Sequence, residues 1–110
     1  MRKLALLLAA AILPACDTKT QRDNVHVSVQ NQGATETVRV RIEVERAWSS
    51  DIDREVIVLP GERALFDYDE VTRIALRVYR TSDSFKVFDD FWHADDLRRL
   101  HDDVAVTVDP

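Results

Sequence analysis

The side chains best suited to chemistry in this chain are carboxylates that gather towards the C-terminus. Ca²⁺ takes about six to eight oxygen ligands, and loop carboxylates supply them. The spacing here does not follow an EF-hand, which alternates its ligands around a central glycine. We interpret the group as solvated loop acids and helix caps, some of them paired with Arg98 and Arg99. Calcium binding stays an open alternative. The group consists of Asp89, Asp90, Asp95, Asp96, Asp102 and Asp103.

Other reactive groups are sparse. His26, His93 and His101 could bind zinc with neighbouring aspartates, but they lack the spacing of a zinc motif. The sequence contains no glycine-rich phosphate loop, Cys-x-x-Cys, His-Glu-x-x-His or Gly-x-Ser-x-Gly motif. Its two glycines, Gly33 and Gly61, stand where turns are expected. We therefore predict neither an enzyme nor a metal or cofactor site.

The single cysteine stands at the end of the run Leu13-Pro14-Ala15-Cys16, after a basic start at Arg2 and Lys3 and the apolar residues 4–13. This arrangement resembles the export signal and lipobox of bacterial lipoproteins. The resemblance implies cleavage after residue 15, a diacylglycerol on Cys16 and a lipid-anchored, extracytoplasmic protein on the periplasmic side. The apolar stretch is shorter than the ~20 residues of a membrane-spanning helix. Ordinary secretion, with a free thiol at Cys16, is the alternative.

The expected anchor sets the location of an acidic domain. Several acyl chains hold a protein on the bilayer almost permanently. Asp17 resembles an inner-membrane retention signal of some bacteria, and the choice between inner and outer membrane stays open. Removing residues 1–15 changes the formal net charge from −5 to −7, because it removes Arg2 and Lys3 and no acid. Basic and acidic residues are interleaved, so nucleic acid is not an expected partner.

Hydrophobic periodicity predicts short strands after a polar tether at residues 17–24. Alternation of apolar and charged residues is typical of half-buried strands. In residues 55–59, Glu55 is followed by four consecutive apolar residues, which is typical of a strand covered on both faces or of one that switches between sheets. This segment is the best candidate for a central strand. Asp95 or Asp96 could cap a helical turn with Leu97 and Leu100 on one side. The predicted strands are residues 25–29, 38–45, 55–59, 64–68, 72–80, 85–91 and 104–108, with turns at 31–35, 60–62 and 81–84.

Seven short strands at regular spacing predict an all-β fold, an antiparallel β-sandwich with one short helical turn. Residues 25–66 resemble the opening half of bacterial Ig-like modules, through Val-x-Val-x-Val-x-Asn-x-Gly, a long alternating strand and Val-Leu-Pro-Gly-Glu. The expected organisation is a signal peptide at 1–15, a lipidated N-terminus and flexible tether at 16–24, and the β-sandwich at 25–110.

These features favour a protein that binds a partner. Trp48, Tyr79 and Trp92 are large amphipathic side chains of the type enriched at interfaces, and they are the candidates for partner contact. Phe66, Phe85, Phe88 and one tryptophan are expected in the core. The predicted function is a non-catalytic binding or assembly module at the cell envelope, with an envelope protein as partner. The alternatives are an inhibitor or immunity-type factor that blocks a cationic hydrolase with the acidic residues 89–103, and a calcium- or ligand-binding domain.

Overall fold

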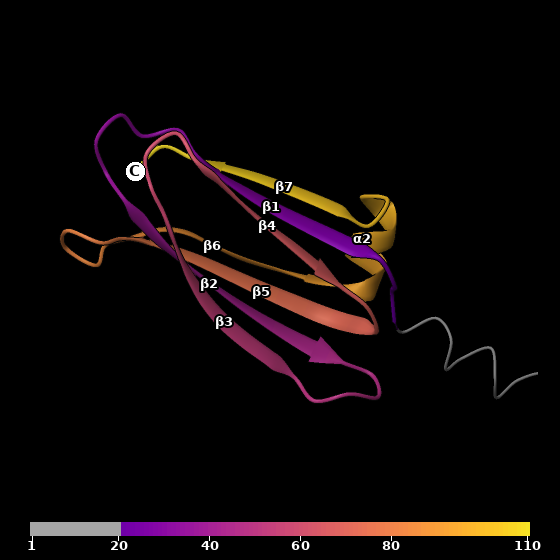
Figure 1. Cartoon of the computed structure of the whole chain (residues 1–110). Coiled ribbons are helices and arrows are strands. Elements are labelled where there is room, and N and C mark those ends of the chain that lie inside the picture. The colour runs from indigo at the N-terminus through magenta and orange to yellow at the C-terminus, as the bar shows by residue number, and fades with distance from the viewer. Residues whose placement is uncertain (1–20) are drawn as a thin grey trace, which may run out of the picture.

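The computed structural model describes residues 21–110, which fold into two β-sheets packed face to face (Figure 1). Cys16 and the predicted signal peptide lie outside the described residues. The elements are β1 (Val25–Asn31), β2 (Val38–Arg46), β3 (Ile52–Val58), β4 (Arg63–Tyr68), β5 (Val71–Arg80), β6 (Lys86–His93), α2 (Ala94–Arg99) and β7 (Asp103–Val108). None of the helices in these residues is long and apolar enough to cross a membrane.

The prediction of an all-β sandwich is confirmed. One sheet has the strand order β4-β1-β7 and the other β3-β2-β5-β6. Strict alternation explains the core: in β1, Val25, Val27 and Val29 are at most 1% exposed, whereas the residues between them face solvent or lie half-buried. The inward residues of β2, β5 and β7 are buried too, and those of β2 and β5 meet those of β1 and β7 across the sandwich.

One strand pair departs from the expected antiparallel arrangement. β7 runs parallel to β1, with Val27 beside Val104. The reason is the position of α2, which receives the chain from β6 and returns it to the other sheet at the end where β1 begins (Figure 1). The chain therefore enters β1 and β7 from the same end, and every other strand pair among the described residues is antiparallel.

The prediction that residues 55–59 form a central strand is wrong. β3 lies at the edge of its sheet and pairs with β2 alone. Its outward residue Ile57 is 56% exposed, and Leu59, just beyond the strand, is 50% exposed, whereas the inward Val58 is 2% exposed. The chain then turns at Pro60-Gly61, where Gly61 has φ +82°, a conformation that glycine adopts without steric cost. The apolar run thus precedes a corner at which the chain changes sheets.

The aromatic side chains divide between the core and the surface. Phe66 is 3% exposed, as expected, and Phe88 and Trp92 are half-buried against the core with their rings stacked 6.4 Å apart. Phe85 was expected in the core, and that prediction is wrong, because the side chain is 57% exposed. Phe85 precedes the register shift between β5 and β6, and its ring lies 4.7 Å from the Arg80 guanidinium carbon. Phe85 therefore packs against Arg80 at the turn between β5 and β6 instead of filling the core.

The helix forms where it was expected but has a different cap. Its N-cap is His93, and the backbone N–H of His93 donates to the Asp96 carboxylate over 3.0 Å. Leu97 is fully buried, whereas Leu100 is 43% exposed. The two leucines were expected on one side of the helical turn, and only Leu97 enters the core, because the last helical residue is Arg99 and Leu100 already turns with the departing chain.

The described part of the predicted tether is bound to the domain, so the expectation of flexibility is wrong for residues 22–24. Arg22 forms an isolated β-bridge with Val71, with both backbone hydrogen bonds at 2.8 Å. Its guanidinium donates two hydrogen bonds of 2.8 Å to the Asp102 carboxylate. Asn24 N–H donates to the carboxylate of Asp69. The folded domain therefore begins before Val25, where the expected boundary lay. We call this set of contacts the N-terminal clasp.

Candidate functional site

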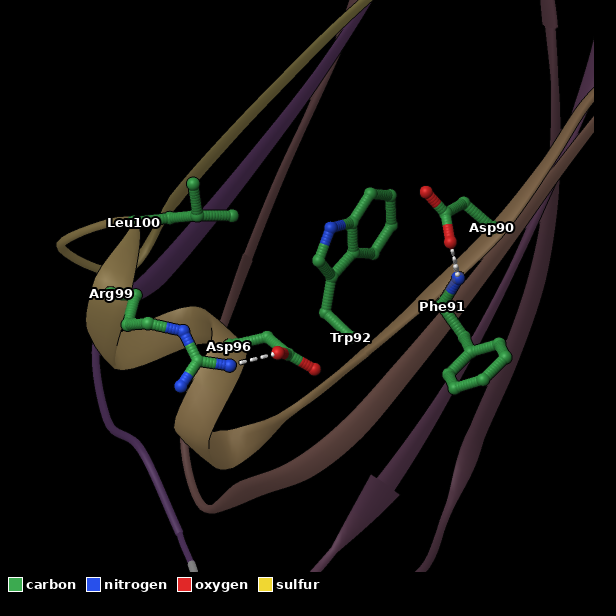
Figure 2. Close-up of a pocket in the computed structure, with 6 residues that line it drawn as sticks. All are labelled: Asp90, Phe91, Trp92, Asp96, Arg99 and Leu100. Carbon is green, nitrogen blue, oxygen red and sulfur yellow. Dashed lines mark hydrogen bonds and ion pairs between the residues drawn. The ribbon is translucent and has the colours of Figure 1, made fainter.

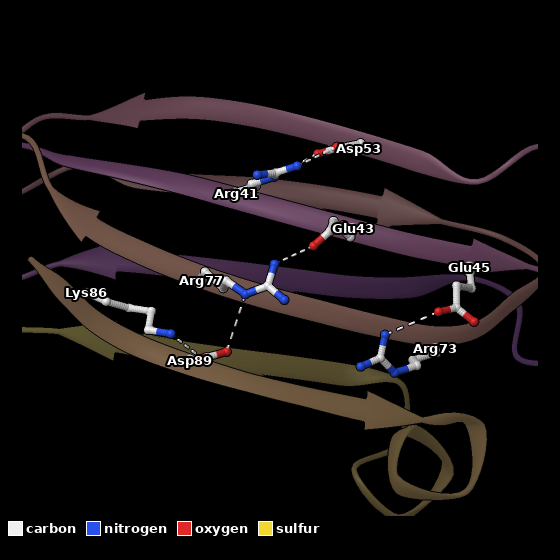
Figure 3. A network of polar contacts seen from close by, with 8 residues as sticks. All are labelled: Arg41, Glu43, Glu45, Asp53, Arg73, Arg77, Lys86 and Asp89. Carbon is white, nitrogen blue, oxygen red and sulfur yellow. Dashed lines mark hydrogen bonds and ion pairs between the residues drawn. The ribbon is translucent and has the colours of Figure 1, made fainter. Parts of the chain in front are cut away.

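The outer surface of the four-stranded sheet carries a dense array of charged side chains (Figure 3). They occupy the positions that alternate with the buried residues of β2, β3, β5 and β6. We call this surface the charged sheet face. Its basic members are Arg39, Arg41, Arg73, Arg77 and Lys86, and its acidic members are Glu43, Glu45, Asp53, Glu55 and Asp89. Basic and acidic groups are equal in number, so the face is neutral although the chain is acidic.

Strand register places like charges opposite one another on this face. Arg41 lies directly across from Arg77, and Glu43 directly across from Asp53. Like charges in opposite positions destabilise a sheet. Several ion pairs therefore run along diagonals, from Arg41 to Asp53 at 2.9 Å and from Arg77 to Glu43. Arg73 and Glu45, which are directly opposite, also pair.

Hydrogen bonding across the face favours the charged form of its members. The hydrogen bond from Arg41 lowers the pKa of Asp53, and the hydrogen bond from Lys86 lowers that of Asp89. In return, the hydrogen bond to Glu43 raises the pKa of Arg77. For Asp53, Asp89 and Arg77, these shifts of the pKa favour the charged form that takes part in the ion pairs.

Two arginines of the face also cover aromatic rings. The Arg39 guanidinium carbon lies 4.8 Å from the centre of the Tyr79 ring, and that of Arg73 lies 4.8 Å from the centre of the Phe91 ring. Phe91 is 49% exposed, and Ile57, beside Arg39, is 56% exposed. The face thus offers apolar contact area between arginines that are already held in place, a combination common at protein interfaces.

The three aromatic residues predicted to contact a partner do not form one surface. Trp48 lies in the loop between β2 and β3 and is 78% exposed. Tyr79 lies half-buried on the charged sheet face, below Arg39. Trp92 lies on the other side of its sheet, half-buried against the core. Only Tyr79 of these three belongs to the charged sheet face.

Trp92 also lines a shallow pocket of about 350 Å³ between β6 and α2 (Figure 2). Arg99 and Leu100 line the side of α2, and the Arg99 guanidinium is paired with Asp96 at 2.5 Å. On the strand side, the Asp90 carboxylate accepts a hydrogen bond from the backbone N–H of Phe91. The pocket is therefore lined by an aromatic ring, an aliphatic side chain and a charged pair.

The acidic residues 89–103 are largely engaged within the protein. Asp95 pairs with Arg98, Asp96 with Arg99, and Asp102 with Arg22. Within residues 21–110, no group of three or more His, Cys, Asp or Glu side chains is placed to hold a metal ion. In the described part of the chain, His26, His93 and His101 therefore belong to no such group, and the His26 ring pairs with Asp67.

Sequence reasoning missed the apolar members of the charged sheet face. Ile57 belongs to the run at 55–59, the expected central strand, and Phe91 ends the predicted aromatic strand 85–91, in which no face was assigned to it. The alternation in Asp89, Phe91 and His93 places Phe91 outward with two polar residues, and this signal could have identified it. The positions of the arginines, in contrast, followed directly from the alternation in β2.

Comparison with known proteins adds no further constraint, since neither a scan against protein-family models nor a search of curated proteins finds a match to this chain.

Proposed function

We propose that this protein is a lipid-anchored lipoprotein of a bacterial cell envelope whose β-sandwich serves as a non-catalytic binding or assembly module outside the cytoplasm. The lipobox-like run ending at Cys16 supports the anchor. The observation that carries the binding role is the charged sheet face, with its exposed Phe91 between arginines that are already paired.

The physical argument for recognition is preorganisation. A partner that docks on free arginines must order long side chains and remove water from unpaired charges. On this face the arginines are held by carboxylates and aromatic rings, as Arg73 is held by Glu45 and Phe91. Docking there loses less side-chain entropy, and the apolar rings supply area to bury. We propose an envelope protein as the partner.

The geometry favours assembly over inhibition of a cationic hydrolase. An inhibitor of that kind would offer unpaired carboxylates to a basic active site. Asp89, Asp95, Asp96 and Asp102 each have a basic partner within the chain, which reduces the charge available to an incoming cation. Binding to one basic enzyme that salt abolishes would reverse this preference.

The anchor is tested with Cys16→Ser. We expect the variant to move from the membrane to the soluble fraction with an unchanged unfolding midpoint, because the contacts of the sandwich are made among residues 22–110. The mass of the mature wild-type chain should correspond to residues 16–110 plus acyl groups. Retention of the serine variant on the membrane, or a mass without acyl groups, would contradict the proposal.

The binding role is tested with a photo-crosslinking amino acid at position 91. In cells that produce the anchored protein, we expect one discrete adduct with an envelope protein. The matched control is position 65, because Leu65 is 70% exposed on the outer surface of the other sheet. Adducts from position 65 and none from position 91 would place the contact elsewhere and overturn the assignment of the face.

A further inference from the structure

One end of the sandwich gathers the N-terminal clasp, the loop between β2 and β3, the turn between β4 and β5, and α2 (Figure 1). Hydrogen bonds join three of these segments through Glu70. Its backbone N–H donates to the Asp23 carboxylate at 2.9 Å. Its own carboxylate accepts from the backbone N–H of Trp48 at 3.2 Å and of Ser49 at 3.1 Å. The loop that carries Trp48 is therefore tied to the start of the described chain.

The backbone at this end is held in conformations that side chains other than glycine rarely adopt. Asn24, Glu70, His101 and Asp102 all have φ between 56° and 61°. Such conformations cost about 1 kcal/mol or more each and persist only where surrounding contacts enforce them. Here the clasp supplies those contacts, since Asp102 binds Arg22 and Asn24 binds Asp69. These contacts hold the backbone of this end, which we call the platform, in these conformations.

Trp48 is the most exposed large apolar side chain of the described residues, at 78%, and it stands on this platform. Its backbone is fixed by Glu70, so the indole is presented to solvent from a defined position. An indole combines an apolar body with one N–H donor and is suited to the boundary between lipid headgroups and acyl chains.

The length of the preceding chain brings this end close to the anchor. Arg22 follows Cys16 by six positions, so their Cα atoms are at most ~22 Å apart even in an extended chain. We propose that Trp48 inserts into the headgroup layer of the membrane that holds Cys16, so that this end of the sandwich faces the lipid. The inference rests on the proposed lipidation. A contact too weak to bind the domain alone becomes effective under such a tether, because the local concentration of lipid is high.

The negative charge at this end of the sandwich determines which lipid headgroups it can contact. The acidic side chains at this end are engaged with neighbouring groups: Asp23 with Glu70, Asp69 with Asn24, and Asp51 with the backbone of Arg46. Their negative charge remains and repels anionic headgroups. The lipid that fits is therefore zwitterionic, and phosphatidylcholine is the probe.

The test uses the acylated full-length protein in phosphatidylcholine vesicles whose acyl chains carry bromine near the glycerol backbone, since bromine quenches a nearby indole. The chain contains two tryptophans, Trp48 and Trp92. We expect wild-type emission to fall by on the order of half, because Trp48 is quenched while Trp92 stays half-buried against the core. The matched control is Trp48→Phe, which changes an exposed side chain, and its remaining emission should not respond to bromine.

Flotation of the same vesicles separates the two proposals. Protein that floats with the vesicles while its emission is unchanged by bromine overturns the insertion of Trp48 and leaves the anchor intact. Equal quenching of wild type and Trp48→Phe overturns it as well. Protein that fails to float overturns the anchor, and the membrane contact of Trp48 with it.

Discussion

At the scale of single residues, Asn31 is the buried polar side chain of the described residues, and it is fully enclosed. Its amide group donates to the carbonyl oxygens of Glu36 at 2.8 Å and Val58 at 3.1 Å, and its amide oxygen accepts from the Gly33 N–H at 2.8 Å. Because a buried amide with all its partners satisfied specifies one arrangement, Asn31 locks the β1–β2 loop against the end of β3.

We predict that Asn31→Asp destabilises the fold by about 3 kcal/mol at neutral pH, because the new carboxylate faces two carbonyl oxygens and loses both donated hydrogen bonds. Urea unfolding followed by circular dichroism measures the change. The control is Gln32→Glu, which makes the same amide-to-carboxylate change at an exposed neighbour and should shift stability by less than about 0.5 kcal/mol. Equal effects of the two substitutions would show that Asn31 is not enclosed as described.

At the scale of elements, β3 shows how an apolar run can end at a surface. Val58 points into the sandwich and Ile57 points away from it, although the two are adjacent in sequence. The sandwich has two layers, so no layer covers Ile57 on the outer surface, and the edge position also leaves it with a neighbouring strand on one side only.

Threonine at each of these two positions gives a matched comparison. Val58→Thr should cost about 2 kcal/mol of unfolding free energy, because it buries a hydroxyl without a partner. Ile57→Thr should change it by less than about 0.5 kcal/mol, because threonine also suits an exposed strand position. Thermal and urea unfolding measure both. Similar losses would mean that β3 is covered on both faces.

The short helix is expected to depend on one leucine. Leu97→Ala should destabilise the protein by about 3 kcal/mol, because the side chain is fully buried and its removal leaves a cavity. Leu100→Ala should cost less than about 1 kcal/mol, because Leu100 is 43% exposed and follows the helix. Urea titrations of the two variants would detect a reversed order, which is incompatible with this placement of α2.

At the scale of the whole molecule, stability at acidic pH depends on carboxylates held by arginines, a lysine and backbone groups. The hydrogen bond from Arg22 lowers the pKa of Asp102, and that from Arg80 lowers the pKa of Asp83. Backbone hydrogen bonding by His93 lowers the pKa of Asp96. Such groups bind protons less tightly in the folded state than in the unfolded state.

A group whose pKa is lowered by folding stabilises the protein above its unfolded pKa, about 3.9 for aspartate. That contribution is lost as the pH falls through the folded pKa. We therefore expect the thermal unfolding midpoint to stay constant between about pH 7 and about pH 5 and to fall below about pH 4. Asp102→Asn should weaken the decline, and scanning calorimetry across this pH series measures it. A midpoint that rises on acidification would contradict the assigned ion pairs.

Several features of this protein follow from the sequence alone. The alternating valines of β1, β2 and β7 predict the strands, the inward residues and the sandwich, because a period of two sorts side chains between core and water in any half-buried strand. The arginines and glutamates of β2 were placed outward for the same reason. The turn at Pro60-Gly61 followed from the backbone preferences of those two residues.

Strand order, and everything that depends on it, was decided by the tertiary structure. The alternation that identifies a strand contains no information on its neighbours, so neither the edge position of β3 nor the parallel pairing of β7 could be read from it. The same holds for the charged sheet face, whose diagonal ion pairs need the register of three strands, and for the N-terminal clasp, where Arg22 meets Asp102 across 80 positions of sequence. Contacts between distant segments exist only once the sheets have packed, because packing alone brings those segments within hydrogen-bonding distance.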